Sequence, residues 1–339
     1  MGRHRCSRRR FLGALGAGAA AGLAGCTGLG VVGEPDGSAD RLTAFHAGSL
    51  APPFSTLEPD FEAETGVDVT REVKGSVGST QKITEQGRSA DVLGVSDFRL
   101  LRDRLLPEFG DWYAAFATNE MAIQFRPDAP GADRISTDNW WEVLSRDDVT
   151  VGHSDPAVDP GGYRAVMVQQ LGAVEFDGRR LYGDATYRRL RANSTAPTGT
   201  ETNLRTHLRS GTVDYAIYYR SIAETTDLPS VALQPHVNLG EATDEYAAHY
   251  AEATVETDAG TFTGAPIAYG ITVPSVADSP EAGARWVEHV ATAPGREALT
   301  ASGFEPTDPV VVPANRAADV PERVRAVARS RDALGPLSL

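Results

Sequence analysis

The stretch 119-NEMAIQF-125 is an extended apolar run that leads out of a polar segment, and 265-APIAYGITVP-274 has the same character. Such runs are suited to carry a chain from one lobe into another. If the chain leaves one lobe at the first run and returns at the second, residues 42–122 and 268–339 form lobe 1, and residues 123–267 form lobe 2. Two lobes with a double connection make a hinge around a cleft, which is a design for enclosing a ligand.

Around these two runs, short β-like segments alternate with helical ones. This alternation predicts an α/β architecture with mainly parallel sheets. Strands are expected at 42–45, 67–73, 91–96, 121–125, 149–154, 214–219, 230–234 and 267–273, and helices at 53–65, 79–87, 98–105, 138–145, 162–172, 202–210 and 280–292.

The first 25 residues are expected to be an export signal. They combine an arginine-rich start with a Gly/Ala/Leu segment that is too short and too weakly apolar for a membrane span. Within them, 7-SRRRFL-12 resembles the twin-arginine (Tat) export motif, and 23-LAGC-26 resembles a lipobox whose Cys26 is lipidated after cleavage. Residues 26–40 follow as a flexible tether. We therefore expect an exported lipoprotein anchored to the outer face of the cytoplasmic membrane.

Cysteine usage and charge exclude several classes of function. Only Cys6 and Cys26 occur in the 339 residues, so the mature domain has no disulfide, no cysteine-ligated zinc and no thiol nucleophile. Without the five arginines of residues 1–25, the 32 basic residues become 27 against 46 acidic ones, a formal net charge of −19. This acidity disfavours nucleic acid as a partner, because a phosphate backbone needs a basic surface. Lys74 and Lys82 are the only lysines, and an acidic, lysine-poor surface is typical of a halophile's protein, which works in high salt.

The chain has few signs of an enzyme. It lacks a Gly-x-Ser-x-Gly elbow, a His-Glu-x-x-His helix and a Gly-x-x-x-x-Gly-Lys loop. Ser49 and His46 do not make a hydrolase, because no placed acid completes the constellation. We therefore expect no enzymatic activity, and an exported hydrolase is the weakest alternative.

Segments between strands and helices are placed to bind an anion through the backbone. The N-terminus of a helix offers free N–H groups and the positive end of the helix dipole. A compact dianion could therefore be held without a basic side chain. Four such corners occur, two in each expected lobe: 46-HAGSL-50, 74-KGS-76, 159-DPGG-162 and 199-GTETN-203.

Seven ordered motifs span about 230 residues: 46-HAGSL-50, 75-GSVGSTQKITEQGRSADV-92, 111-DWYAAFATNEMAIQF-125, 138-DNWWEVL-144, 154-SDPAVDPGGYRAVMV-168, 214-DYAIYYRSIA-223 and 268-AYGITVP-274. Together they resemble archaeal-type molybdate/tungstate-binding proteins, the substrate-binding components of ABC transporters. The resemblance implies a two-lobed periplasmic-binding-protein type II fold, with mixed, mainly parallel sheets and a double-stranded hinge. It also implies a monomer that uses no cofactor, takes molybdate or tungstate as its ligand, and has an ABC permease and ATPase as partners.

The resemblance also implies a set of ligand-binding residues. Hydroxyl and amide groups would bind the oxyanion, and two carboxylates would reach the metal centre and expand its tetrahedral geometry to an octahedral one. Asp159 matches the first carboxylate, as a direct ligand of molybdenum or tungsten, whereas Tyr218 stands where the second, a glutamate, is expected. Besides a backbone amide in 201–203, the implied oxyanion ligands are Gly48, Ser49, Ser76, Asp159, Gly161, Tyr218 and Tyr219.

A second binding function stays open because Tyr218 and Tyr219 are adjacent. This pair resembles the tyrosines with which ferric-iron-binding proteins of the same fold hold Fe³⁺, and Asp159 would add a hard oxygen ligand. Alternation along a strand points neighbouring side chains to opposite faces, which would let only one of the tyrosines reach the cleft. Ferric iron is therefore the alternative to an oxyanion.

Overall fold

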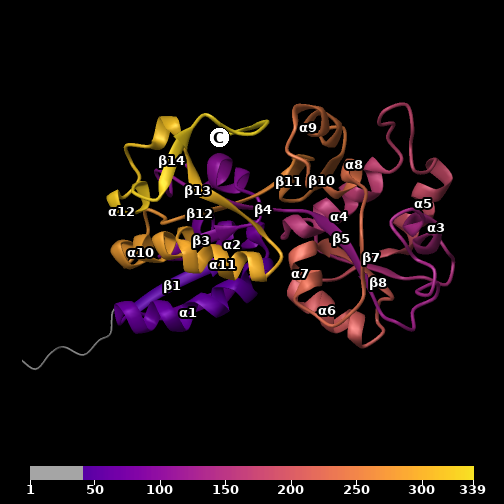
Figure 1. Ribbon diagram of the computed structural model, residues 1–339, viewed down its shortest axis with the longest axis horizontal. Coiled ribbons are helices and arrows are strands. Elements are labelled where there is room, and N and C mark those ends of the chain that lie inside the picture. Colours follow the sequence, from indigo (N-terminus) through magenta and orange to yellow (C-terminus); the bar gives the residue numbers. More distant parts are fainter. Residues whose placement is uncertain (1–40) are drawn as a thin grey trace, which may run out of the picture. The chain divides into compact units, whose positions relative to one another are not determined.

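The computed structural model describes residues 41–339, in which two main β-sheets are flanked by helices (Figure 1). The expected export signal at 1–25, the lipidation site Cys26 and the tether at 26–40 lie outside the described residues. Within residues 41–339, no helix combines the length and the apolar character that a membrane crossing needs.

The larger sheet has seven strands in the order β14-β13-β4-β12-β3-β1-β2. We call this sheet and its helices the seven-stranded half. Its strands are β1 (Arg41–His46), β2 (Asp68–Val73), β3 (Val92–Val95), β4 (Ala114–Asn119), β12 (Ile267–Thr272), β13 (Glu305–Pro313) and β14 (Ala328–Arg331). Its helices are α1 (Ala51–Thr65), α2 (Ser76–Thr84), α10 (Pro280–Ala291), α11 (Ala293–Ala301) and α12 (Glu322–Arg325), with short turns η1 (Gly48–Leu50), η2 (Leu101–Leu105) and η3 (Ala314–Arg316).

The second sheet has five strands in the order β7-β6-β8-β5-β9, and with its helices it forms the five-stranded half. Its strands are β5 (Met121–Phe125), β6 (Val151–Ser154), β7 (Ser194–Thr198), β8 (Tyr215–Tyr219) and β9 (Ser230–Ala232). Its helices are α3 (Trp140–Leu144), α4 (Pro160–Leu171), α5 (Asp184–Asn193), α6 (Glu201–Arg209), α7 (Arg220–Glu224), α8 (Pro235–Asn238) and α9 (Asp244–Tyr250). Two small hairpins are β10 (Thr254–Thr257) with β11 (Gly260–Thr263), and β15 (Ala333–Leu334) with β16 (Leu337–Ser338).

The chain passes between the halves at two places. Strand β4 ends at Asn119 in the larger sheet and β5 begins at Met121 in the smaller one, and β12 returns to the larger sheet at Ile267. The assignment of 42–122 with 268–339 to one lobe and of 123–267 to the other stays a prediction.

Parallel and antiparallel pairs occur in similar numbers, so the sheets are mixed without being mainly parallel. Strands β5 and β12, which each begin as the chain enters a sheet from the other half, run antiparallel to their neighbours. The pairs of β1 with β2 and β3, and of β6 with β7 and β8, are parallel as expected. The pairs that β5 and β12 form with their neighbours account for most of the antiparallel pairs in the two main sheets.

Aromatic packing fixes α1 on the seven-stranded half. Phe54 and Phe61 are two turns apart on α1, so they lie on the same face of the helix. Both rings meet the buried indole of Trp286 on α10 edge-on, with centroids 5.4 and 5.0 Å away. The helix ends at Gly66, whose φ of 69° is the left-handed conformation that glycine adopts without strain. These contacts hold the start of α1, and hence the 46-HAGSL-50 corner, against the sheet.

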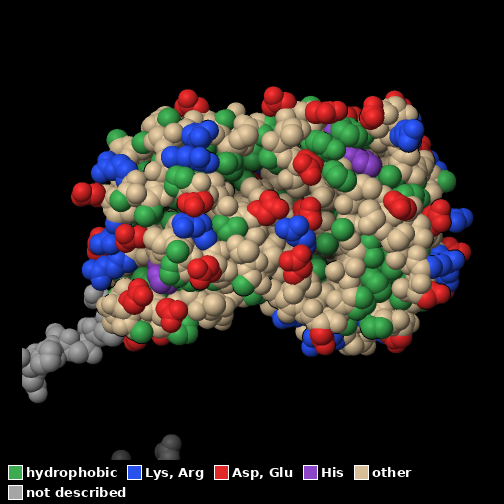
Figure 2. Space-filling model, viewed as in Figure 1, with side chains coloured by type: hydrophobic (Ala, Val, Ile, Leu, Met, Phe, Trp, Pro, Cys, Tyr) green, Lys and Arg blue, Asp and Glu red, His purple; other side chains and the backbone are tan. Residues whose placement is uncertain are grey.

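Acidic and basic side chains are interspersed over the face drawn in Figure 2. Several of them form pairs: Lys82 Nζ lies 2.6 Å from a carboxylate oxygen of Glu72, and an Arg323 guanidinium nitrogen lies 2.7 Å from one of Glu288. Such partly exposed pairs each contribute little to stability. They do show that basic groups on the surface are matched by neighbouring acids.

The two halves approach each other closely at glycines of the corners. A Cβ atom on Gly75, just before α2, would lie 2.2 Å from the carbonyl oxygen of Val158 on the five-stranded half. The N–H of Gly78 donates to the same carbonyl at 3.2 Å. Only a glycine at position 75 leaves room for this backbone-to-backbone contact.

Gly75→Ala should therefore separate the two halves. The added methyl group needs a shift of about 1 Å to reach an ordinary contact distance from Val158, and neither backbone can yield cheaply. Small-angle X-ray scattering should give a larger radius of gyration for this variant. Gly183→Ala is the matched control, since a Cβ there meets nothing within 4 Å. Superimposable scattering curves for wild type and Gly75→Ala would contradict the contact.

His46 makes stability depend on pH. Burial lowers the pKa of His46 from 6.5 to about 4, and its Nδ1 lies 2.8 Å from the carbonyl oxygen of Ala47. The unfolded chain takes up the proton near pH 6.5, whereas the folded chain takes it up only near pH 4, so stability falls as pH drops through this window. The loss should reach about 3 kcal/mol.

Urea unfolding of the wild type and of His46→Asn at several pH values tests this. The wild type should lose more unfolding free energy between pH 6.5 and pH 4 than the variant does. Equal losses in the two proteins would show that His46 does not carry the effect.

Candidate functional site

All four corners that were expected to bind an anion lie against one another where the two halves meet. Gly75 contacts Val158 and Asp159, and on the other side a Cβ atom on Gly48 would lie 2.8 Å from the hydroxyl oxygen of Thr202. A cavity of about 50 Å³ lies beside two of these corners, 46-HAGSL-50 and 199-GTETN-203. It is lined by Gly48, Ala51, Pro52, Glu201, Thr202, Arg205, Ile222 and Thr225.

Two buried carboxylates, those of Asp159 and Glu201, lie at the centre of this region. Asp159 caps α4: its Oδ1 accepts from the N–H of Gly161 at 3.0 Å, and its Oδ2 accepts from the N–H of Glu201 at 3.3 Å. Each residue is only 1% exposed. Among the described residues, neither carboxylate oxygen of Glu201 has a hydrogen-bond partner of ordinary geometry, although the nearby backbone N–H of Ser49 favours its ionised form. An unsatisfied buried carboxylate is costly, and its usual explanation is a ligand or ion.

The surroundings of this pair disfavour two negative charges. Burial, followed by the charge of Asp159, raises the pKa of Glu201 well above its usual range. Burial also raises the pKa of Asp159, against the opposing effect of the N–H groups of Gly161 and Glu201. The charge of Arg164 favours ionisation of both acids, but burial and their mutual repulsion outweigh it. The two acids therefore do not both ionise unless further positive charge comes close to them.

Gly161 sets how near Glu201 comes to the start of α4. A Cβ atom at position 161 would lie 2.1 Å from Glu201 Oε1, which no real side chain could tolerate. Because Gly161 has no side chain, the carboxylate of Glu201 at the start of α6 can lie against the backbone at the start of α4. The N–H that Gly161 was expected to offer to a ligand is bonded to Asp159.

The two expected serines have different surroundings. Ser49 is buried, and its Oγ lies 2.8 Å from the hydroxyl oxygen of Tyr269 on β12. Ser76 is also buried, but its Oγ accepts from the N–H of Ser96 at 3.0 Å and lies 3.0 Å from the Ser96 hydroxyl. Both side chains are thus bonded within the seven-stranded half, and Ser49 differs in adjoining Gly48, which lines the cavity.

Strand alternation separates the two tyrosines at the end of β8. Tyr219 accepts from the Arg164 guanidinium at 2.6 Å, whereas the Tyr218 hydroxyl donates to the side-chain oxygen of Gln124 on the neighbouring strand. The two hydroxyls have different partners and do not converge on one point. The structure therefore does not support Tyr218 as a ligand, and it disfavours the two-tyrosine iron site, because a guanidinium occupies the place beside Tyr219.

A further observation bears on the iron alternative. Among residues 41–339, no three His, Cys, Asp and Glu side chains are grouped so that they could hold a metal ion. Asp159 and Glu201 are a pair without a third such ligand.

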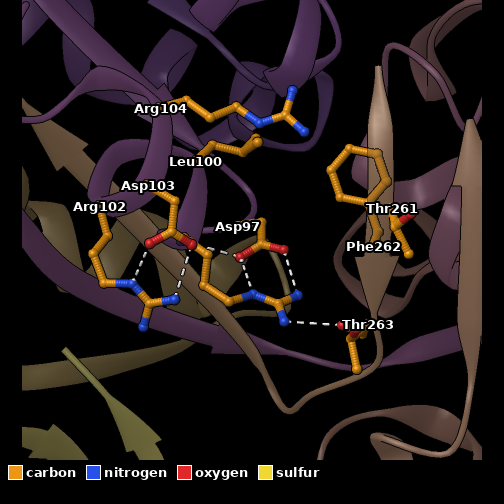
Figure 3. A pocket seen from close by; sticks show the side chains of 9 residues that line it. Asp97, Leu100, Arg102, Asp103, Arg104, Thr261, Phe262 and Thr263 are labelled. Carbon is orange, nitrogen blue, oxygen red and sulfur yellow. Dashed lines mark hydrogen bonds and ion pairs between the residues drawn. The ribbon is translucent and has the colours of Figure 1, made fainter. Parts of the chain in front are cut away.

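A charged network centred on Asp97 adjoins the site and links the two halves. Asp97 accepts from the Tyr163 hydroxyl at 2.7 Å and lies 3.3 Å from the Arg164 guanidinium, both on α4 of the other half. Arg99 binds the same carboxylate at 2.9 and 2.7 Å and donates to the carbonyl oxygen of Thr263 on β11 at 2.9 Å (Figure 3). Although burial opposes its ionisation, the two arginines hold the pKa of Asp97 well below its usual range.

This network runs along one wall of a cavity of about 330 Å³. Arg99 bonds to both Asp97 and Thr263. Figure 3 shows Arg102 bonded to Asp103 near Asp97. Arg104 donates to the carbonyl oxygen of Ala259 at 2.8 Å. The β10–β11 hairpin of the five-stranded half is thus tied to residues 97–104 of the seven-stranded half.

The structure therefore brings most of the expected residues to one place. Gly48, Ser49, Asp159, Gly161 and Tyr219 surround the meeting corners, and Ser76 starts the adjoining helix α2. Tyr218 is directed elsewhere. Their roles as ligands stay proposals.

Sequence reasoning missed the carboxylate of Glu201. The 199-GTETN-203 corner was expected to contribute only a backbone amide. An acidic residue in the first turn of a helix is common, because it complements the helix dipole. The sequence therefore gives no signal that separates Glu201 from an exposed helix-start acid such as Asp184. Its burial beside Asp159 is what distinguishes it.

Known proteins resemble this chain in sequence. A solute-binding protein of Methanoculleus marisnigri, named as uncharacterized, is 36% identical over 314 residues, which cover 85% of this chain and 86% of that protein. The molybdate/tungstate-binding protein WtpA of Pyrococcus abyssi is 32% identical over 335 residues, covering 91% of this chain and 96% of that protein.

Solved structures share the fold. The sulfate-binding protein SubI of Mycobacterium tuberculosis matches with a TM-score of 0.57 at 16% identity, over 86% of this chain and 94% of that one. The periplasmic molybdate-binding protein of Azotobacter vinelandii matches with a TM-score of 0.56 at 14% identity, over 78% and 98%. These likenesses confirm the expected two-lobed periplasmic-binding-protein type II fold.

The family comparison covers most of the chain. A family described as bacterial extracellular solute-binding protein matches residues 42–305. Its members are binding proteins of transport systems, which confirms the expectation that the chain is not an enzyme. The chain belongs to the bacterial extracellular solute-binding protein family.

Proposed function

We propose that this protein captures molybdate or tungstate and delivers it to an ABC importer, binding the oxyanion without chemical turnover. Two relatives support this ligand, since proteins of Pyrococcus abyssi and Thermococcus kodakarensis at 32% and 30% identity are both named molybdate/tungstate-binding protein. The observation that carries the proposal is the buried pair of carboxylates, Asp159 and Glu201, among the starts of helices from both halves.

Electrostatics supports this ligand over sulfate. Two unit charges 4 Å apart in a site of effective dielectric constant about 20 repel by about 4 kcal/mol, and a dianion doubles this for each carboxylate that is ionised. The sulfur atom of sulfate accepts no further ligands, so it offers no compensating bond. Molybdenum(VI) and tungsten(VI) centres do accept carboxylate oxygens. A site with two buried carboxylates therefore favours an oxyanion whose central atom they can bind directly.

Hydrogen-bond donors would hold the oxo groups around that centre. The helices α1, α2, α4 and α6 all begin at the meeting corners, so their N–H groups and dipoles favour negative charge there. The hydroxyls of Ser49 and Tyr219 add neutral donors beside them. At the high ionic strength that the acidic composition indicates, the Debye length falls to about 3 Å near 1 M salt. Donors at contact distance then outweigh the distant net charge.

Glu201 takes the role of the second carboxylate in this proposal. Tyr218 was expected to stand in its place, but its hydroxyl donates to Gln124. Glu201 instead begins α6 and lies against Gly161 and the Gly48 corner. With Asp159 and Glu201 as direct ligands, the tetrahedral oxyanion would become octahedral.

Capture would involve closure of two lobes. We propose that residues 42–122 with 268–339 form one lobe and residues 123–267 the other, with the hinge at the β4–β5 passage and before β12. The links of Asp97 to Tyr163, Arg164 and Arg99 join the halves next to the carboxylates. They would stabilise the closed form that a permease recognises.

The setting of this function follows from the N-terminal sequence. We propose that a Tat signal exports the chain and that Cys26 carries a lipid, which anchors a monomer to the outer face of the cytoplasmic membrane. The importer's permease and ATPase are then its partners.

Isothermal titration of the protein with tungstate, molybdate, sulfate and phosphate tests the ligand. Tungstate and molybdate should bind at least tenfold more tightly than sulfate and phosphate, because only their central atoms can accept Asp159 and Glu201. Sulfate binding as tightly as both would refute the assignment.

Glu201→Gln tests the second carboxylate. The substitution keeps the shape of the side chain but replaces a strong oxygen ligand by a weak one, so the affinity for tungstate should fall by about 10- to 100-fold. Titration calorimetry measures the change, with Glu256→Gln, on the exposed side of β10, as the matched control. If Glu201→Gln binds tungstate like the wild type, Glu201 is not a ligand.

A further inference from the structure

The first turn of helix α1 has no free N–H group for an anion. Pro52 and Pro53 lie in this turn, and proline has no N–H. The N–H groups of Leu50 and Ala51 are already bonded to carbonyl oxygens of the preceding turn. These four positions are the ones whose N–H groups a helix start ordinarily leaves free. Helix α1 therefore acts on an anion through its dipole, and hydrogen bonds on this side of the site must come from elsewhere.

Arg205 is the basic side chain that lines the cavity beside this corner. It lies one turn after Glu201 on α6 and is half-buried. Among residues 41–339, its guanidinium has no hydrogen-bond or ion-pair partner. The next arginine of the helix, Arg209, is exposed and lies 2.6 Å from a carboxylate oxygen of Asp227. The N–H donors of Arg205 are thus left for a ligand in the cavity.

Glu201 and Arg205 bring opposite charges to the same cavity without bonding to each other. A glutamate four residues before an arginine is ordinarily a favourable pair on a helix. The carboxylate of Glu201 is instead directed to the corners, since Cβ atoms on Gly161 and Gly48 would lie 2.1 and 3.2 Å from its oxygens. An oxyanion in the cavity would therefore meet the carboxylate with its metal centre and the guanidinium with an oxo group.

The cavity has room for such oxo groups. Its volume is about 50 Å³, and one water molecule needs roughly 10–15 Å³ of such space, so several oxygen-sized atoms fit. Its walls come from both halves, with Ala51 and Pro52 at the start of α1 and Arg205 on α6. An oxyanion bound to Glu201 can thus extend oxo groups between the guanidinium and the positive end of the α1 dipole.

We propose that Arg205 binds an oxo group of the captured oxyanion directly. The inference rests on the proposed function and adds a charged donor to the neutral donors that hold the oxo groups. A hydrogen bond from a guanidinium to an anion is about twice as strong as one between neutral groups. The positive charge also offsets the repulsion between the dianion and an ionised carboxylate. Because the contact is made at short range, high salt does not remove it.

Arg205→Gln tests this contact in a calorimetric titration with tungstate. The affinity should fall by about 10- to 100-fold, because the oxyanion loses a charge-assisted hydrogen bond. The loss should persist in about 1 M salt, where the Debye length is about 3 Å. Arg205→Lys should bind with an intermediate affinity, since lysine keeps the charge but not the planar set of donors.

Arg209→Gln is the matched control. It removes the same charge from the same helix, at an exposed position that does not line the cavity. It should bind tungstate like the wild type. Both glutamine variants should keep melting temperatures close to that of the wild type, because neither arginine is fully buried.

A double-mutant cycle with Glu201→Gln distinguishes a ligand contact from a simpler role, in which Arg205 is only the counter-ion of Glu201. If Arg205 binds an oxo group, Arg205→Gln weakens tungstate binding in the wild-type and in the Glu201→Gln background. If Arg205 only neutralises the carboxylate, its replacement has little effect once the carboxylate is gone.

Three outcomes would overturn the inference and leave the proposed function intact. They are a wild-type affinity of Arg205→Gln, a loss that disappears in high salt, and a loss that is confined to the wild-type background. A wild type that binds sulfate more tightly than tungstate refutes the proposed ligand alone, and the same variants are then measured with sulfate, whose oxygens need the same donor. A wild type that binds none of these oxyanions refutes both.

Discussion

The arrangement of the site depends on the burial of two carboxylates, Asp159 and Glu201, between backbone corners of both halves. Removing a carboxylate from water costs several kcal/mol unless hydrogen bonds or positive charge compensate. Asp159 has two N–H donors, but Glu201 has no hydrogen-bond partner of ordinary geometry among the described residues. A cationic centre with oxygen-accepting chemistry, such as molybdenum(VI) or tungsten(VI), would compensate both, and the rest of the site fits this requirement.

The burial of the two carboxylates requires glycines at the corners. Gly75 lets the start of α2 touch the backbone next to Asp159, and Gly161 lets Glu201 rest on the start of α4. Larger side chains at either position would hold the halves apart or displace the carboxylate. One turn into α4, Arg164 places a positive charge near the acids and bonds to Ser96, Asp97 and Tyr219. Closure of the halves and the electrostatics of the site thus depend on the same helix.

Much of this fold could be predicted from the sequence because its strands and turns carry local signals. The run 42-LTAF-45 became β1, and the crossing run 119-NEMAIQF-125 became the end of β4 and all of β5. The expectation that most strand pairs are parallel was wrong, because the pattern of apolar residues in a strand does not reveal the direction of that strand. Alternation along a strand was the argument against both Tyr218 and Tyr219 reaching the cleft, and in the structure their hydroxyls have different partners. Glu201 could not be identified, because its burial depends on an approach between halves that local patterns do not encode.

X-ray absorption at the tungsten edge of the tungstate-bound protein tests the central claim most directly. Asp159 and Glu201 as direct ligands predict an octahedral centre, with carboxylate oxygens at longer distances than the oxo groups. A tungsten centre that keeps the tetrahedral shell of free tungstate would contradict the account, since the two carboxylates would then have no bond to the metal.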